Sequence, residues 1–455
     1  MDRNKILDLV KEYVKEEYSQ KAFIEGESSV PVSGRVFDED DIVTLVDSAL
    51  DFHLTTYRYN DEFEKGLKEF FGLKYALSCN SGSSANLIAV TSLTSHLLKE
   101  RALKTGDEVI TVAAGFPTTV NPILQNNLIP VFVDVELETY NVNTELIEKA
   151  ITDKTKAIIL AHTLGNPFNI KKVKEICDKH NLWLIEDCCD AFGSTYDNKK
   201  VGTFGDIATL SFYPAHHITM GEGGAVLTNN PVLKKAMESI RDWGRDCWCP
   251  PGCDNTCNQR FTQKLGDLPE GYDHKYTYSH LGYNLKITDM QAACGVAQLR
   301  KVNAFIEKRK NNFKKLNEKL QKFDKYLILP KSQENSEPSW FGFLISVKED
   351  APFTRNDIVK YFNDNKIGTR LLFAGNIIKQ PYMINRSYRV HGELINSDFI
   401  MNNTFWIGVY PGINDEMINY IEMSLNKFIA EQSRAEQSRA EQSRAEQSRQ
   451  AGSSL

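Results

Sequence analysis

The chain has 455 residues, with 60 Asp or Glu against 54 Lys or Arg, so its formal net charge is −6. This acidic balance argues against a nucleic-acid partner, because binding to phosphates needs concentrated Lys and Arg. No run of about 18 apolar residues is present, so we expect no membrane span. The first residues are charged throughout and contain no apolar signal core. We therefore expect a cytoplasmic protein.

The first part of the chain predicts a helix and an arm. Apolar positions recur at helical spacing over 4–18, which indicates an amphipathic helix. An arm with Pro and Gly follows, and a second helix is expected from about residue 38. We assign 1–45 to this N-terminal helix and arm.

The region 46–300 alternates between short β-rich runs and helical patterns. The β-rich runs are 108–114, 129–135, 156–162, 182–187 and 207–212, and helical stretches include 86–100, 143–151 and 170–180. Strands that alternate with helices predict an α/β fold with a mostly parallel sheet covered on both faces. We expect this large domain to hold the functional site.

The rest of the chain predicts a smaller domain and a tail. A long helix over 289–323 leads out of the large domain. The segment 301–428 then mixes strands (341–347, 405–410) with helices (355–365, 414–428), which predicts a small α+β C-terminal domain. The motif AEQSR is repeated four times from residue 430, so 429–455 is interpreted as a low-complexity tail without chemistry.

Two segments place polar groups where an α/β fold binds ligands. SCNSGSSAN, residues 78–86, lies between a strand and a helix, where Gly and Ser offer N–H and hydroxyl groups to an anion. Asp187 ends the apolar run 182–187, and such a carboxylate can pair with a protonated pyridine nitrogen. Taken alone, a capped turn and a capping Asp explain the two segments as well.

Four ordered motifs resemble the sugar aminotransferase and dehydratase family. They are SGSSAN (81–86), IEDCCDAFG (185–193), SFYPAHH with GEGGAV (211–226) and GYNLKITDMQAACGVAQL (282–299). The resemblance covers roughly residues 30–428. It implies the fold type I architecture of pyridoxal-phosphate transferases, a large mostly parallel sheet domain with a smaller α+β C-terminal domain, assembled as a homodimer.

One position departs from the family's usual pattern. Where a Lys five residues after the motif Ser holds pyridoxal phosphate covalently, this sequence has His216, and no Lys occurs between Lys200 and Lys234. The resemblance therefore implies that the cofactor is held noncovalently in its amine form, pyridoxamine 5′-phosphate. An imidazole, with an ordinary pKa of about 6.5, can carry protons there as the catalytic base. His217 is the competing base, and a packing role for His216 in an inactive relative is the alternative.

The resemblance implies further roles around the cofactor. Asp187 faces the ring nitrogen, Asp190 stands where aminotransferases carry Gln near the ring hydroxyl, and His162 is a candidate to face the same site. The remaining implied contacts are the phosphate ligands Ser83, Ser84 and Ser211, the ring-stacking Phe116, and Asn284, donated across the dimer interface.

Six of the nine cysteines fall into two groups, 188–189 and 247–257, and we assign the second group to a Cys-rich insert of the large domain at 245–260. The second reads C-x-C-x3-C-x3-C, and thiolates at this density hold zinc or an iron–sulfur cluster. Spacing does not choose between the two. The resemblance to the family's iron–sulfur 3-dehydrases implies a 2Fe–2S cluster on Cys189, Cys247, Cys249 and Cys257. A local set with Cys253 in place of Cys189 is the alternative.

The resemblance thus implies a dehydrase that removes the C3 hydroxyl of a CDP-linked 4-keto-6-deoxyhexose. Electrons would reach the site through the cluster from an NADH-dependent flavin/iron–sulfur reductase, in 3,6-dideoxyhexose (O-antigen) biosynthesis. Two alternatives stay open. One is a cluster-free 3-dehydratase with structural zinc, and the other is a non-enzymatic metal-thiolate redox sensor on a degenerate aminotransferase fold.

Overall fold

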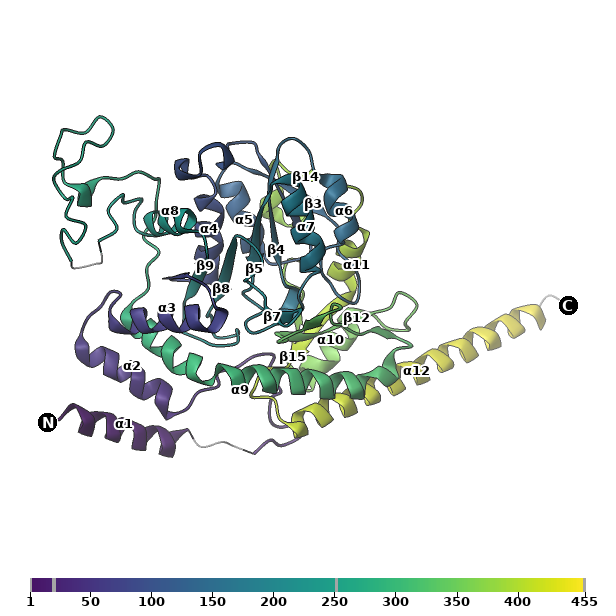
Figure 1. Cartoon of the computed structure of the whole chain (residues 1–455). Coiled ribbons are helices and arrows are strands. Elements are labelled where there is room, and N and C mark those ends of the chain that lie inside the picture. Colours follow the sequence, from purple (N-terminus) through teal and green to yellow (C-terminus); the bar gives the residue numbers. More distant parts are fainter. Residues whose placement is uncertain (1, 19–21, 250–252, 453–455) are drawn as a thin grey trace.

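The structure is a computed structural model that describes residues 2–18, 22–249 and 253–452. A large sheet lies between helices, and a second, smaller sheet lies beside the long helix α9 (Asp289–Leu320) (Figure 1). Among the described residues, no helix combines the length and apolar character needed to cross a membrane.

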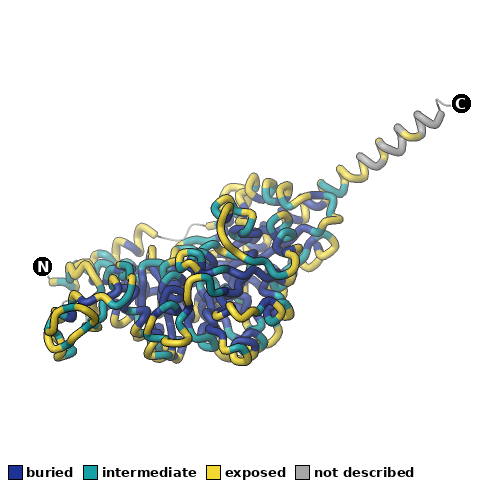
Figure 2. The backbone as a smooth tube through the Cα atoms, turned by 90° about the horizontal axis from the view of Figure 1, so that it is seen from above, coloured by how far each residue is buried: buried dark blue, intermediate teal, exposed yellow. Residues whose placement is uncertain are grey.

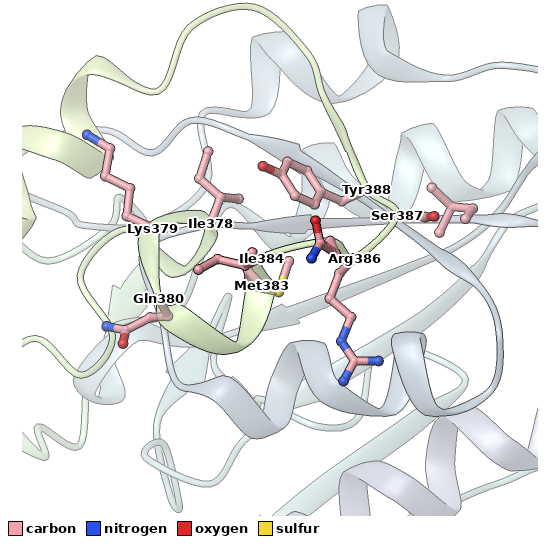
Figure 3. Close-up of a pocket in the computed structure, with 10 residues that line it drawn as sticks. Ile378, Lys379, Gln380, Met383, Ile384, Arg386, Ser387 and Tyr388 are labelled. Atoms are coloured by element: carbon pink, nitrogen blue, oxygen red, sulfur yellow. The ribbon is translucent and has the colours of Figure 1, made fainter.

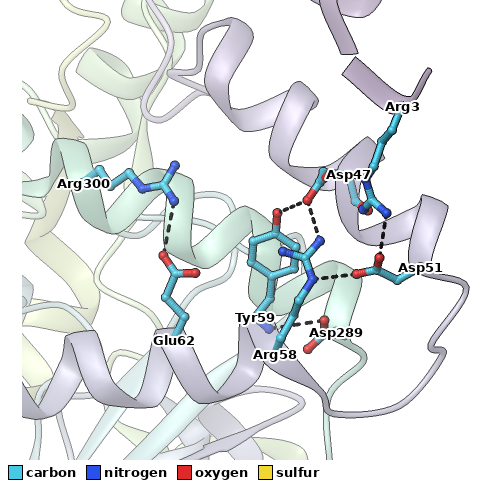
Figure 4. A network of polar contacts seen from close by, with 8 residues as sticks. All are labelled: Arg3, Asp47, Asp51, Arg58, Tyr59, Glu62, Asp289 and Arg300. Carbon is cyan, nitrogen blue, oxygen red and sulfur yellow. Dashed lines mark hydrogen bonds and ion pairs between the residues drawn. The ribbon is translucent and has the colours of Figure 1, made fainter. Parts of the chain in front are cut away.

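The N-terminal helices are fastened to one another by charged side chains (Figure 4). They are α1 (Arg3–Glu17), α2 (Glu39–Asp51) and α3 (Arg58–Phe71). Arg3 donates to the carboxylates of Asp47 (2.7 Å) and Asp51 (2.9 Å), and Arg58 donates to both from the other side. The predicted helix over 4–18 is confirmed, and the contacts of Arg3 explain why it lies against α2.

The large sheet has eight strands in the order β1-β9-β8-β5-β4-β2-β3-β14. The strands are β1 (Tyr75–Cys79), β2 (Glu108–Val112), β3 (Ile129–Val133), β4 (Thr155–Ala161), β5 (Trp183–Asp187), β8 (Ile207–Ser211), β9 (Gly224–Thr228) and β14 (Arg389–Val390). Only β9 pairs antiparallel with its neighbours; the other pairings are parallel. The predicted mostly parallel sheet is confirmed.

Helices cover both faces of this sheet, as predicted. They include α4 (Gly82–Ser92), α5 (Pro117–Gln125), α6 (Thr144–Ala150), α7 (Ile170–His180) and α8 (Pro231–Arg241), with the 3₁₀ turns η1 (His96–Arg101) and η2 (Thr163–Gly165). Successive residues of a strand point to opposite faces. Leu184 accordingly joins the core under α7, whereas Ile185 joins the core under α4. The helix expected over 86–100 begins earlier, because Ser81 caps it, and ends at Ser92.

The second sheet has four antiparallel strands in the order β10-β12-β15-β13. They are β10 (Leu327–Ile328), β12 (Gly342–Val347), β15 (Thr404–Gly408) and β13 (Arg370–Leu371), packed with α10 (Arg355–Asp364) and α11 (Ile395–Asn403). This is the expected smaller α+β part. Helix α9 runs across residue 300 and β14 joins the large sheet, so the predicted domain limits stay a prediction.

The remaining elements are short, apart from the last helix. A three-stranded sheet is formed by β11 (Ser336–Glu337), β6 (Thr195–Tyr196) and β7 (Lys199–Lys200), and 3₁₀ turns are η3 (His274–Tyr276), η4 (Gln321–Phe323), η5 (Ile377–Lys379) and η6 (Pro381–Met383). Helix α12 (Asp415–Gly452) continues through the AEQSR repeats and extends away from the body of the molecule (Figures 1 and 2).

Candidate active site

A cavity of about 740 Å³ opens where β4, β5 and β8 end at their carboxyl termini. This is the edge at which open parallel sheets bind ligands. Seven predicted site residues line it: Ser83, Phe116, Asp187, Cys189, Asp190, Ser211 and His216. Further lining residues that sequence reasoning did not assign include Thr119, Glu222, Arg370 and Trp406.

Asp187 is held rigidly at the floor of the cavity. Its Oδ2 accepts from Asn86 Nδ2 (2.8 Å) and Thr119 Oγ1 (2.7 Å), and its Oδ1 accepts from the Cys189 N–H (3.1 Å). The amide of Asn86 is fixed in turn, because its Oδ1 accepts from Thr209 Oγ1 at 2.7 Å. The carboxylate therefore cannot rotate away from a group in the cavity. Asn86 ends the SGSSAN motif, so the sequence carried a signal for it.

The start of α4 forms an anion-binding corner of the cavity. The first intrahelical bond runs from the Ala85 N–H to Ser81 O (3.0 Å), so the N–H groups of Gly82 and Ser83 precede the helical bonding pattern. Such N–H groups and the helix dipole favour a phosphate. A Cβ on Gly82 would lie 2.4 Å from Ser211 Cβ, so glycine is what allows Ser211 to approach the helix start.

Ser84 differs from the other predicted phosphate ligands. Its N–H donates to Ser81 Oγ (3.0 Å), and its hydroxyl accepts from the same oxygen (3.0 Å). The Ser84 side chain does not line the cavity. The structure thus places Ser84 in the helix cap, and its phosphate contact stays a prediction.

Phe116 offers an aromatic face within the cavity. It lies immediately before α5, and 48% of its surface is exposed. Its ring meets Phe373 edge-on, with centroids 5.3 Å apart. A large exposed aromatic in a cavity wall is a suitable partner for a flat ring.

His216 faces Asp190 inside the cavity. His216 Nδ1 lies 3.5 Å from Asp190 Oδ1 and has no hydrogen-bond partner among the described residues. Burial, reinforced by the positive charge of Arg309, lowers the pKa of His216 to about 4. Burial, reinforced by the charge of Asp187, raises the pKa of Asp190 well above its ordinary value. At neutral pH the imidazole is therefore uncharged and free to accept a proton.

The side chains of His217 and His162 form hydrogen bonds outside the cavity. His217 Nε2 lies 2.8 Å from the Ser339 carbonyl and outside the cavity lining, so the competing base has a structural contact instead. His162 Nδ1 accepts from the Phe168 N–H (3.3 Å), so Nε2 carries the proton donated to Glu186 (3.1 Å). Both nitrogens of His162 are thus occupied, and the residue neither lines the cavity nor has an atom free for a metal, although Cys188 is close by.

Asn284 is exposed and lies outside the cavity. Its Oδ1 accepts from Lys286 Nζ at 2.8 Å. A single chain therefore does not bring it to the cofactor corner, and its role across a dimer interface stays a prediction.

The thiols of the Cys-rich insert gather in a second, separate place. Cys247, Cys249, Cys253 and Cys257 line a cavity of about 10 Å³ together with Arg260 and Lys275. The Cys249 N–H donates to Cys247 Sγ at 3.5 Å. Burial raises the pKa of Cys249, but hydrogen bonds from Thr256, the Cys257 backbone and the neighbouring thiols outweigh it, so the pKa falls to about 6. A thiolate is thus available for a metal.

The predicted fourth ligand, Cys189, lies apart from these thiols within one chain. Cys189 lines the large cavity, and its Sγ is 3.1 Å from the position a Cβ would take on Gly82. The structure therefore places Cys253 around the same small cavity as the other insert thiols and Cys189 beside Asp187, and the choice of fourth ligand stays a prediction.

A third concavity, of about 520 Å³, is lined by Ile129 and residues of the segment 378–388 (Figure 3). It contains none of the predicted site residues. It therefore has no part in the chemistry described above.

The mostly parallel sheet with one reversed strand, the helix start suited to an anion and the buried Asp at the end of β5 are the features of the fold type I architecture of pyridoxal-phosphate enzymes. The chain belongs to the DegT/DnrJ/EryC1/StrS aminotransferase family, whose profile matches residues 37–426. This confirms the predicted fold and family.

The chain is also similar to individual proteins of this family. It is 61% identical over 426 residues to the lipopolysaccharide biosynthesis protein RfbH of Salmonella typhimurium (94% of this chain, 98% of the relative). It is 52% identical over 431 residues to dTDP-4-dehydro-2,6-dideoxy-D-glucose 3-dehydratase of Saccharopolyspora spinosa (95% and 93%). A solved structure of E. coli GDP-4-keto-6-deoxy-D-mannose-3-dehydratase with bound hydrated PLP matches with a TM-score of 0.78 at 30% identity, over 87% of this chain and 99% of that chain.

Proposed function

We propose that this protein is a cytoplasmic nucleotide-sugar 3-dehydrase that works with pyridoxamine 5′-phosphate and removes the C3 hydroxyl of a CDP-linked 4-keto-6-deoxyhexose. The observation that carries the proposal is His216, an uncharged imidazole in a cavity whose other groups suit the cofactor and which lacks the Schiff-base Lys. Relatives named as 3-dehydratases and as a lipopolysaccharide biosynthesis protein support it.

The residues present fit the cofactor. Nδ1 of His216 is buried and accepts or donates no hydrogen bond within the described part of the chain, and the close approach of Ser211 to Gly82 forms a corner that an anion can fill. When bound, pyridoxamine phosphate would supply an amine for the C4 ketone and a ring that accepts electrons. Gly82, Ser83 and Ser211 would hold its phosphate, and Phe116 would cover its ring.

Asp187 and His216 divide the proton chemistry. Asp187, fixed by three donors, would hold a proton at the ring nitrogen. His216 would take a proton from the C4′ carbon and deliver it to the C3 hydroxyl, which would leave as water. Phe116, Phe341 and Trp406 form apolar walls that limit the access of water.

We also propose a 2Fe–2S cluster on the insert. Cys247, Cys249 and Cys257 supply three thiolates, and the fourth comes from Cys189 or from Cys253. Arg260 and Lys275 line the same small cavity, where both form ion pairs with Asp254. The cluster would pass two electrons singly from NADH by way of a flavin/iron–sulfur reductase. Together with two protons, these electrons balance the replacement of the C3 hydroxyl by hydrogen and its release as water. The product is the 3-deoxy-4-keto sugar, an intermediate for 3,6-dideoxyhexoses of an O-antigen.

We propose a homodimer as the active form. Asn284 is exposed in the single chain, and an interface would carry it to the phosphate corner of the partner subunit. Size measurement in solution tests this proposal, since a stable monomer with full activity would contradict it.

One observation favours a second candidate, a cluster-free 3-dehydratase with structural zinc. The four insert thiols line one small cavity apart from the cofactor cavity, and a structural metal takes its ligands from such a local set. In that case glutamate would replenish the cofactor amine. Iron, zinc and acid-labile sulfide analysis of anaerobically purified protein separates the two candidates.

The function itself is tested in ¹⁸O-labelled water. Protein loaded with pyridoxamine phosphate is mixed with CDP-4-keto-6-deoxyglucose, and label at C3 is followed by mass spectrometry. We expect exchange of the C3 oxygen without reductase, and 3-deoxy product when reductase and NADH are added. Loaded protein that neither exchanges nor forms product would overturn the proposal, and 3-deoxy product with glutamate alone would establish the second candidate.

A further inference from the structure

Arg309 is a buried cation that binds only backbone carbonyls. It lies on α9, is 1% exposed, and no carboxylate of the described residues forms an ion pair with it. Its Nη1 donates to the carbonyls of Trp340 (3.1 Å) and Phe341 (3.2 Å), and its Nη2 donates to the carbonyl of His216 (3.2 Å). A buried charge without a paired charge is costly. Because burial of this guanidinium costs free energy, we infer that Arg309 has a role at this position.

The three carbonyls belong to two segments that meet behind the cavity. One is the turn after β8 that carries His216, and the other is the stretch that enters β12. A second contact joins the same segments, because His217 Nε2 lies 2.8 Å from Ser339 O. The ring of Phe341 lies 5.2 Å from the ring of His216. The guanidinium therefore fixes the backbone of residue 216 relative to the wall against which its side chain rests.

Arg309 keeps its charge in this place. Burial lowers its pKa to about 9, and the nearby Asp190 acts in the opposite direction, so the guanidinium is cationic at neutral pH. A charged donor makes stronger hydrogen bonds than a neutral one. The planar fork also reaches two directions at once, which a Lys ammonium cannot reproduce.

We propose that Arg309 is a positioning residue that aims the side chain of residue 216 at the cofactor's reactive carbon by holding the 216 carbonyl from behind. The importance of this aim for catalysis rests on the proposed function. The positional claim itself does not, because it can be measured without any sugar substrate.

Asn312 supplies a matched control on the same helix. It is fully buried, and its Nδ2 donates to the carbonyls of Val409 (3.2 Å), Tyr410 (3.1 Å) and Ile413 (3.2 Å). Like Arg309, it is a polar side chain of α9 that satisfies three carbonyls. Unlike Arg309, it touches nothing in the cofactor cavity.

The experiment places a reactive amine at the position that Arg309 is proposed to aim. In the His216→Lys variant, the new amine reacts with bound pyridoxal phosphate, and the adduct is trapped with borohydride and counted by peptide mass mapping. We expect added Arg309→Met to slow adduct formation by on the order of 100-fold, the effect of a displacement of about 1 Å, with unchanged cofactor affinity. Arg309→Lys should give an intermediate rate, and Asn312→Ala should lower the thermal midpoint without slowing adduct formation.

The outcomes distinguish the positioning role of Arg309 from the proposed function of the site. An unchanged rate in Arg309→Met, or an equal loss of rate in Asn312→Ala, overturns the positioning role and leaves the proposed function standing. No adduct at 216 in the single variant, although cofactor is bound, overturns the proposed site and the role of Arg309 with it. If Arg309→Met does not fold, the Arg309→Lys rate decides: a slowed reaction supports the role and an unchanged one contradicts it.

Discussion

Cys188 and Cys189 are neighbours in sequence, yet their thiols lie in different surroundings. Cys188 Sγ lies 3.1 Å from the position of a Cβ on Gly202, in the core, whereas Cys189 Sγ lies at the same distance from that position on Gly82, in the cofactor cavity. Burial raises the pKa of both thiols. Of these two thiols, only that of Cys189 can therefore contact a bound cofactor. Its replacement is the one outside the insert that should affect the cofactor site.

Replacement of the insert cysteines should separate electron transfer from dehydration. Cys247→Ala or Cys249→Ala should give colourless protein that still exchanges the C3 oxygen with labelled water but forms no 3-deoxy product with reductase and NADH. The reason is that Asp187 and His216, the residues proposed for the elimination, lie in a different cavity. Visible absorbance, iron content and product analysis check this. Normal 3-deoxy product from colourless protein would instead support structural zinc.

Two further variants identify the fourth ligand. Either Cys189→Ala or Cys253→Ala should lose the cluster, and the other variant should keep it. Because Cys189 also lies beside Asp187, its variant must be checked for cofactor binding by absorbance. Intact clusters in both variants would contradict both four-thiolate sets.

The two adjacent histidines should respond differently to substitution. His216→Asn should bind the cofactor but lose about 10²–10⁴-fold in C3 oxygen exchange, which is the usual contribution of a general base. His217→Asn should keep exchange and lower the free energy of unfolding by about 1–3 kcal/mol, because it leaves the Ser339 carbonyl unsatisfied. Exchange of the C4′ proton should fall in the first variant only. The reverse pattern would transfer the base role to His217.

On the acid side, C4′ proton exchange should decline at a lower pH than it would with an exposed histidine as the base. With a pKa of about 4, His216 stays uncharged from pH 8 down to about 5, so C4′ proton exchange should be flat over this range and fall towards pH 4. An exposed imidazole would lose activity near 6.5. The same shift should make the cofactor-free protein less stable as pH falls from 6.5 to 4, since the unfolded chain then binds the extra proton. A midpoint near 6.5 in the exchange profile would contradict the buried geometry.

The N-terminal helix should loosen when its carboxylate clamp is removed (Figure 4). Burial opposes ionisation of Asp47, but hydrogen bonds from Arg3, Tyr59 and Arg58 prevail and lower its pKa to about 2. This stabilisation is complete above about pH 4 and is lost as pH falls through 2. Asp47→Asn should raise amide hydrogen exchange in α1 by about 5-fold at neutral pH, equivalent to about 1 kcal/mol. Lys15→Ala, which removes only the exposed Lys15–Glu39 pair, is the control and should have a smaller effect.

The sequence predicted those features that local pattern encodes. Each apolar run of the large domain contains a strand, and three of the four motifs meet at one cavity because the strands beside them end at the same edge of the sheet. No residue of the fourth motif, 282–299, lines this cavity. Asn86 could have been included, since it belongs to the SGSSAN motif, and Thr119 lies only three residues after Phe116. Their contacts with Asp187 need three-dimensional knowledge. Arg309 could not be predicted, because nothing within a long amphipathic helix marks one Arg as facing inward. Similarly, spacing could not reveal that His162 turns towards Glu186 and away from the cavity.

Helix α9 has a consequence for how the molecule can move. Its 32 residues form a rod of roughly 48 Å at 1.5 Å per residue. At its first residue, Asp289 accepts the N–H groups of Tyr57 (2.8 Å) and Asn60 (2.9 Å) at the start of α3. Two to three turns before the end of the helix, Arg309 and Asn312 donate to carbonyls of the segments beside the second sheet. A hinge between the two sheets would have to bend this rod or break its buried contacts. We therefore expect the entry and exit of a sugar nucleotide to depend on movements of surface loops, while the two sheets joined by α9 stay fixed. The rates of these loop movements should limit the rate of substrate exchange.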